Sequence, residues 1–165
     1  MRNNINDRND NTSNQTFFRN KIIQKHDGAS IGKPGGILAE FEKAMQSLQL
    51  ACNRVKTPFE INSAIQRFEF TYKLFWKTLQ AFLFPKGVIA KSPRDIVREA
   101  IRLGILADEM EYTQLIAGNN RDAKHFDPKH SGEIFGRIKF QYLKTMQTAL
   151  LDLKQYVEPR DQPNK

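Results

Sequence analysis

The segment "GNNRDAKHF", residues 118–126, gathers amide, guanidinium, carboxylate and imidazole groups within a few positions. An arginine and a histidine this close can cleave RNA. His125 would move a proton at the 2′-hydroxyl or the leaving oxygen, and Arg121 would stabilise the charge of the phosphorane. The segment also fits a helix end, because Asn119 and Asn120 tolerate the left-handed conformation that closes helices. Structural roles are the commoner use of these residue types, so spacing alone favours the helix end.

A second group that could bind phosphate is the row formed by Arg94, Arg98 and Arg102. Residues four apart are neighbours on one helix face, so this row could hold phosphates singly or along a backbone. The alternative is a solvated face on which Asp95 and Glu99 form local ion pairs, and exposed pairs of this kind contribute little to stability. Spacing alone favours the solvated face.

Other kinds of active site find no support in the sequence. The three histidines are His26, His125 and His130, and no HExxH, CxxC or Glu-x-x-His pattern surrounds them, so we expect no metal site. There is no GxSxG, GxGxxG or GxxxxGK[ST] segment, so we expect no nucleophile elbow, phosphate loop or bound cofactor. The single cysteine, Cys52, falls in an apolar helical pattern and is predicted to be an inert core residue.

The chain has 165 residues and a formal charge of +8, of which residues 1–35 contribute +3 through six Lys/Arg and three Asp. This charge favours polyanionic partners, or it serves only solubility. Residues 1–35 are rich in Asn and Asp and end in a Gly/Pro stretch, so they predict a disordered or extended tail and linker. Residues 36–158 predict one domain, and residues 159–165 a polar C-terminal tail. No signal peptide or apolar run of membrane-spanning length is present, so we expect a cytoplasmic protein.

Apolar residues recur at steps of three and four throughout the domain, which is typical of amphipathic helices. The first helix begins at Ile37, and two start signals follow it: Thr57 with Pro58 and Glu60, and Ser92 with Pro93 and Asp95. In the second helix, Phe70, Leu74 and Trp76 are expected to broaden the apolar face, and Pro85 and Gly87 to end the helix. A fourth helix, with Asp108 as its cap, is predicted to run to about Gly118, and a last one over residues 131–156. No segment alternates as a strand does. The predicted fold is therefore all-α, an antiparallel up-down bundle of about five helices around a four-helix core.

Three segments carry a resemblance to a known family. "AIQRFEFTYKLFWKTLQAFL" (residues 64–83), "SPRDIVREAIRLGIL" (residues 92–106) and His125 with its following aromatic residue resemble the nucleotidyltransferase substrate-binding protein family. The resemblance covers about residues 38–155. This family consists of small helical bundles related to the HEPN superfamily. The resemblance implies a cytoplasmic chain that forms a homodimer and pairs with a separate small nucleotidyltransferase, which carries the catalytic carboxylates.

The resemblance also implies two alternative functions. The first is a non-catalytic substrate-binding or regulatory subunit of a two-component nucleotidyltransferase, in a toxin–antitoxin-like pair. Its binding residues for nucleotide or RNA would be Arg67, Arg98, Asn119, Asn120, Arg121 and His125. The second is a HEPN-type ribonuclease toxin that its partner neutralises, with Arg121 and His125 as catalytic residues.

The sequence departs from the ribonuclease pattern of related toxins at two places. Only three residues separate Arg121 from His125, whereas the pattern has four to six, and Asn119 and Asn120 stand where the family usually has its Arg. Asp127 occupies the position of the tyrosine that the partner can modify. These departures favour binding over cleavage.

Overall fold

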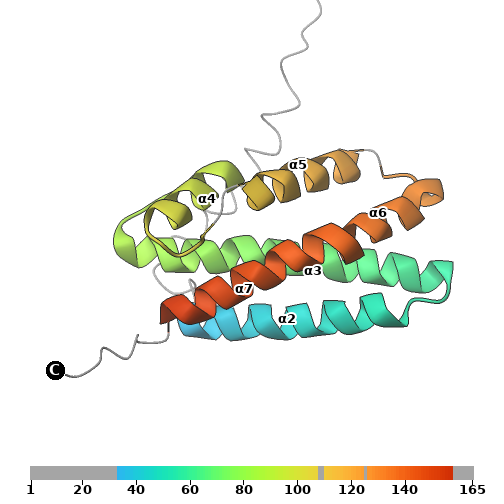
Figure 1. The fold of residues 1–165 in the computed structure, drawn as a ribbon, viewed down its shortest axis with the longest axis horizontal. Coiled ribbons are helices and arrows are strands. Elements are labelled where there is room, and N and C mark those ends of the chain that lie inside the picture. Colours follow the sequence, from blue (N-terminus) through green and yellow to red (C-terminus); the bar gives the residue numbers. More distant parts are fainter. Residues whose placement is uncertain (1–32, 108–109, 125, 158–165) are drawn as a thin grey trace, which may run out of the picture. The chain divides into compact units, whose positions relative to one another are not determined.

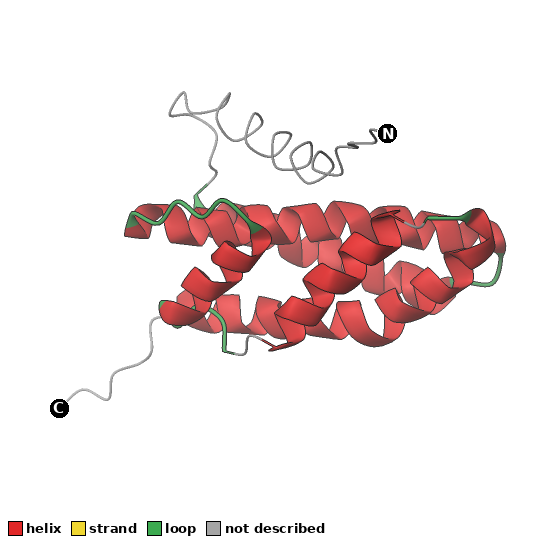
Figure 2. Cartoon of the chain, turned by 90° about the horizontal axis from the view of Figure 1, so that it is seen from above, coloured by secondary structure: helices red, strands yellow, loops and turns green. Residues whose placement is uncertain are grey.

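The computed structural model describes residues 33–107, 110–124 and 126–157. These residues form helices joined by short loops and contain no strand, which confirms the predicted all-α class (Figure 2). Among them, no helix is both long enough and apolar enough to cross a membrane. The predictions for residues 1–32, for Asp108 as a helix cap, for His125 and for the C-terminal tail fall outside the described residues.

The two longest α-helices of this region are α2 (Pro34–Arg54) and α3 (Pro58–Leu83), which pack side by side in opposite directions (Figure 1). α2 begins three residues before the apolar pattern does, so the end of the predicted Gly/Pro linker belongs to the helix. The start of α3 is the predicted capping box. The Thr57 hydroxyl accepts from the Glu60 backbone N–H at 3.3 Å, and the Glu60 carboxylate accepts from the Thr57 N–H at 2.9 Å.

The remaining elements complete the bundle. A short 3-10 turn, η1 (Phe84–Lys86), ends at Gly87 with φ 74°, as Pro85 and Gly87 predict. The helices α4 (Pro93–Arg102) and α5 (Met110–Lys124) follow, and Ser92 caps α4 as predicted. The last elements are η2 (Pro128–His130), α6 (Ser131–Arg137), the π-helical turn η3 (Ile138–Tyr142) and α7 (Leu143–Val157). α2, α3, α5 and the α6–η3–α7 segment therefore alternate in direction (Figure 1).

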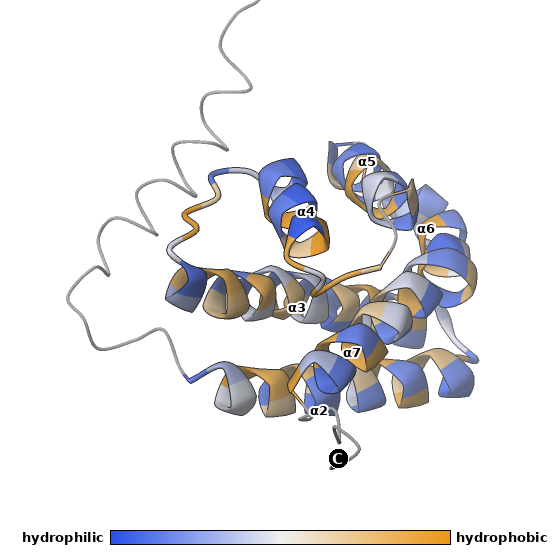
Figure 3. Ribbon diagram, turned by 60° about the vertical axis from the view of Figure 1, so that its left-hand side comes forward, coloured by the Kyte–Doolittle hydropathy of each residue, from blue (hydrophilic) through white to orange (hydrophobic). Residues whose placement is uncertain are grey.

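The core lies where the apolar stripes of these helices meet. Figure 3 shows it most clearly for α4, whose apolar side faces α3 and whose polar side faces away. The centre is aromatic: the Phe75 ring lies 5.6 Å from Phe41, 4.7 Å from Trp76 and 6.1 Å from Tyr112, measured between ring centroids. Cys52 is buried in the same core, and burial raises the pKa of its thiol, as expected for an inert residue.

Two sequence-based expectations are wrong. The helical pattern predicts that Phe70 broadens the buried face of α3, but 63% of it is exposed. The helix predicted to stop near Gly118 continues to Lys124, so Asn119 and Asn120 lie inside α5 and do not close it. The reason for this continuation is tertiary, since Asp122 on the added turns is buried against the last helix.

Candidate functional site

A carboxylate buried between α5 and the last helix organises the segment that contains the candidate residues. Asp122 is 8% exposed and accepts three hydrogen bonds. Arg137 Nε donates to Oδ2 at 3.1 Å, Arg137 Nη2 donates to Oδ1 at 2.7 Å, and the Tyr142 hydroxyl donates to Oδ2 at 3.0 Å. The two-point guanidinium contact fixes the orientation of Arg137 as well as its position. These hydrogen bonds raise the pKa of the Arg137 guanidinium further.

The π-helical turn η3 explains how one carboxylate contacts two residues that are five apart. In a regular α-helix, each residue rotates by about 100°, so Arg137 and Tyr142 would point about 140° apart. Here the Leu143 N–H donates to the Ile138 carbonyl, five residues back. This wider turn brings residues five apart to the same side of the helix. Arg137 and Tyr142 can therefore both face Asp122.

A glycine on α5 makes room for this arrangement. Gly118 lies one helical turn before Asp122, on the same face. A Cβ atom at Gly118 would lie 2.8 Å from Cζ of the Tyr142 ring, which is too close for two carbon atoms. The ring thus packs directly on the α5 backbone. Burial and the neighbouring Asp122 carboxylate raise the pKa of the Tyr142 hydroxyl.

An aromatic layer of α3 underlies this network. Phe68 stacks on Tyr142 with 5.5 Å between ring centroids, and Tyr72 meets Trp76 edge to face at 5.5 Å. Burial raises the pKa of Tyr72 to about 12, although its contacts with Trp76 and Asn119 act in the opposite direction. Asn119, on α5, is half-buried and is one of the groups that act on the Tyr72 hydroxyl.

Asn120 and Arg121 are exposed on α5, in contrast to Asn119 and Asp122. The Arg121 side chain is 64% exposed, and its Nε lies 4.0 Å from Asp122 Oδ1. Two guanidinium groups, of Arg121 and Arg137, thus flank a single buried carboxylate and leave a net positive charge. We call Asn119, Asn120, Arg121 and Arg137 the α5 polar face. It can bind an anion with charge-assisted hydrogen bonds.

Arg98 lies on another element, α4, and is separate from the α5 polar face. Its guanidinium pairs with Asp95 at 3.5 Å, and both side chains are exposed. Arg102 pairs with Glu99 at 2.7 Å. These partners agree with the solvated-face interpretation of the arginine row, since they neutralise part of its charge.

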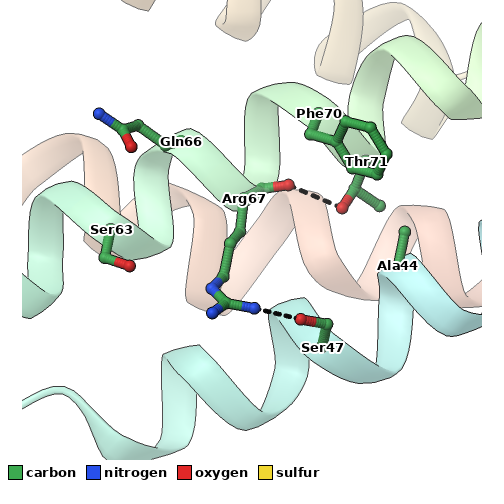
Figure 4. A pocket seen from close by; sticks show the side chains of 7 residues that line it. All are labelled: Ala44, Ser47, Ser63, Gln66, Arg67, Phe70 and Thr71. Carbon is green, nitrogen blue, oxygen red and sulfur yellow. Dashed lines mark hydrogen bonds between the residues drawn. The ribbon is translucent and has the colours of Figure 1, made fainter.

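Arg67 also lies apart from the α5 polar face, because it points toward α2 while the adjacent Phe68 points toward Tyr142. Its Nη1 donates to the Ser47 hydroxyl across an open depression of about 440 Å³ between α2 and α3 (Figure 4). Phe70 and Thr71 line the same depression, and the Thr71 hydroxyl donates to the Arg67 carbonyl at 2.7 Å. Three of the six predicted binding residues, Asn119, Asn120 and Arg121, are consecutive on α5, where successive side chains point about 100° apart. Asn119 is half-buried, whereas Asn120 and Arg121 are exposed.

Three residues of the network were missed from the sequence: Asp122, Arg137 and Tyr142. Their separation of 15 and 20 residues carries no local signal. A π-turn shifts the register of the last helix in a way that a period of 3.6 does not describe. Gly118 could have indicated the site, because a glycine within a helical pattern often marks a place where another segment packs closely on the helix backbone.

Among the described residues, no group of three or more His, Cys, Asp or Glu side chains is arranged to hold a metal ion. No curated protein gives a significant match to this sequence. Residues 37–155 match the family described as nucleotidyltransferase substrate binding protein like, and these are nearly the same residues that carry the resemblance noted above. The chain therefore belongs to the nucleotidyltransferase substrate-binding protein family.

Proposed function

We propose that this chain is a non-catalytic substrate-binding and regulatory subunit of a two-component cytoplasmic nucleotidyltransferase. Membership of the family supports the association with a nucleotidyltransferase. In this proposal, the partner chain supplies the catalytic carboxylates and the nucleotide chemistry. The present chain presents the acceptor substrate or controls its access.

The observation that carries the proposal is the charge arrangement at the α5 polar face. Asp122 uses both oxygens to fix Arg137, and Arg121 extends into solvent beside it. A guanidinium has five N–H donors, and Arg137 directs two of its nitrogens at Asp122. A preoriented guanidinium beside an exposed one suits a phosphate group, because both can donate to its oxygens. The proposed ligand is thus a nucleotide or another phosphate-bearing substrate.

We assign Asn119, Asn120 and Arg121 to this binding face and add Arg137. His125 stays in the proposal because it follows α5 directly in the sequence. Arg67 and Arg98 are left out, since Arg67 extends to Ser47 on α2 and Arg98 pairs with Asp95 on α4. This assignment differs from the sequence-based set in those two arginines.

The test is calorimetric titration of the chain with each of the four nucleoside triphosphates, alone and with its nucleotidyltransferase. The nucleotidyltransferase is the one that co-purifies with the tagged chain from its native host. We expect nucleotide binding that Arg121→Gln weakens about tenfold, which corresponds to the loss of one charged hydrogen bond of ~1.5 kcal/mol. Arg98→Gln is the matched control and should bind as the unaltered chain does. Equal loss in both variants, or no binding to any nucleotide or nucleotidyltransferase, would refute the proposal.

Two finer features of the proposal come from the family resemblance. One is a homodimer within the complex, which light scattering after size-exclusion chromatography measures directly. The other is a toxin–antitoxin-like relation between the two chains. The described residues add no observation in favour of the ribonuclease alternative. If expression of the chain alone arrested growth and His125→Ala relieved the arrest, that alternative would replace the present proposal.

A further inference from the structure

The outer side of the α2–α3 pair is a surface that the proposed function leaves unused. Two exposed apolar side chains lie on it, Leu50 on α2 (54% exposed) and Phe70 on α3 (63%). Two open depressions, of about 440 and 300 Å³, share Ser47, Ser63 and Arg67 as lining residues. They therefore form one continuous groove along the two helices, which we call the α2–α3 groove.

The shape of this groove suits a helix. Small side chains line it, namely Ala44, Ser47 and Ala51 on α2 and Ser63 on α3, and the large apolar lining residues are Leu50 and Phe70. Small residues let another backbone approach closely, and large apolar ones can pack beside it. An amphipathic helix lying in an apolar groove is a common mode of protein recognition.

The charge of the groove identifies the kind of helix. Arg54 and Arg67 are its lining cations, and Glu60 is its lining carboxylate. The Glu60 carboxylate already accepts from the backbone N–H groups of Lys56 and Thr57, at 2.6 and 2.9 Å. The Arg67 guanidinium is held across the groove by the Ser47 hydroxyl (Figure 4). A carboxylate from an incoming helix could pair with Arg67 without reorganising it.

We propose that the α2–α3 groove docks an amphipathic helix of the partner nucleotidyltransferase, with an acidic residue of that helix on Arg67. This inference rests on the proposed function, since it names the surface that holds the partner. Phe70 and Leu50 supply the apolar contact, and Arg67 fixes the register. The α5 polar face remains free for the substrate.

Two other occupants fit the charges less well. A second copy of this chain, packed about a two-fold axis through the groove, would bring Arg67 toward its own counterpart, and like charges repel. The apolar segment of the chain's own N-terminus, residues 16–23, carries Arg19 and Lys21 and no acidic residue. Both occupants would add positive charge to a positive groove.

The test measures the affinity between the full chain and the co-purifying nucleotidyltransferase by calorimetry. Arg67→Glu and Phe70→Ala change exposed side chains, so both variants should fold, which circular dichroism checks. We expect each to weaken binding at least tenfold. The matched controls, Arg98→Glu on α4 and Phe140→Ala on η3, lie outside the groove and should stay within twofold of the unaltered chain. A charge reversal of the contacting acidic residue in the partner should restore binding to Arg67→Glu.

Replacement of Phe70 with a photo-crosslinking phenylalanine analogue identifies the occupant. We expect a crosslink to an acidic helix of the nucleotidyltransferase. A crosslink to a second copy or to residues 16–23 overturns the docking inference. Unchanged affinity in both groove variants, when the unaltered chain binds, also overturns it. Either result leaves the proposed function standing. Failure of the unaltered chain to bind the nucleotidyltransferase contradicts the proposed function itself, and the docking inference falls with it.

Discussion

Gly118 of α5 lies directly against the ring of Tyr142, which belongs to the π-turn of the last helix. This contact sets the distance between the two segments, because a side chain at position 118 would occupy the space of the ring. It also places the Tyr142 hydroxyl 3.0 Å from Asp122, one turn further along α5. The close approach and the buried carboxylate thus depend on each other.

Gly118→Ala should destabilise the protein by about 1–3 kcal/mol, because the added methyl group overpacks a contact that cannot widen without moving Tyr142. Gly136→Ala is the matched control. It is also a helical glycine, but a methyl group added there would have nothing within 4 Å, so the higher helix propensity of alanine should leave stability unchanged or raise it by up to ~1 kcal/mol. Urea denaturation measures both. Equal effects of the two substitutions would contradict the assigned role of Gly118.

The sequence predicts the helices of this fold well where local signals define them. The stripe from Leu38 to Cys52 and the caps at Thr57 and Ser92 depend only on neighbours within a few residues, and the structure shows them as expected. The exposure of Phe70 could also have been predicted. It lies two residues from both Phe68 and Tyr72, about 200° around the helix from each of these buried residues.

The candidate site was less predictable, because it depends on contacts between distant segments. Whether Asn119 and Asn120 end a helix or continue it depends on Asp122, whose partners are Arg137 and Tyr142. No periodicity in residues 110–124 indicates where those partners lie. Tertiary contacts commonly override local propensity in this way.

The ion pair between the buried Asp122 and the half-buried Arg137 should contribute more to stability than an exposed one. Arg137→Met leaves the Asp122 carboxylate buried with fewer donors, and we expect a loss of about 2–3 kcal/mol. Arg98→Met removes the exposed partner of Asp95 and should change stability by less than about 0.5 kcal/mol. Thermal and urea denaturation of both variants check the comparison. A loss of the same small size in Arg137→Met would show that the network is not a stabilising element.

The ionisation of Tyr72 should be visible through the single tryptophan, Trp76, whose ring lies 5.5 Å away. A tyrosinate this close accepts excitation energy and quenches indole fluorescence. The pKa of Tyr72 is raised from 10.0 to about 12, so folding favours its neutral form. The resulting stabilisation is complete below pH 10 and is lost as the pH rises through about 12.

We therefore expect the fluorescence of Trp76 to fall with a midpoint near pH 12, together with the loss of helical circular dichroism if unfolding accompanies ionisation. Tyr72→Phe provides the control. This variant has no hydroxyl to ionise at position 72, so the quenching of Trp76 by a tyrosinate there should disappear. Quenching near pH 10 with intact helices would show that Tyr72 is not protected by burial.

The Cys52 thiol should react slowly in the folded protein. It is 1% exposed on α2, and burial raises its pKa, so the reactive thiolate is both scarce and inaccessible. Labelling with a chromogenic disulfide reagent at pH 8 should be at least a hundredfold slower in the native chain than in 6 M guanidinium, with a native rate that follows global unfolding. Gly118→Ala should speed labelling in proportion to its loss of stability. Rapid labelling of the native chain would instead reveal local opening of α2 around Cys52, independent of the α5 contact.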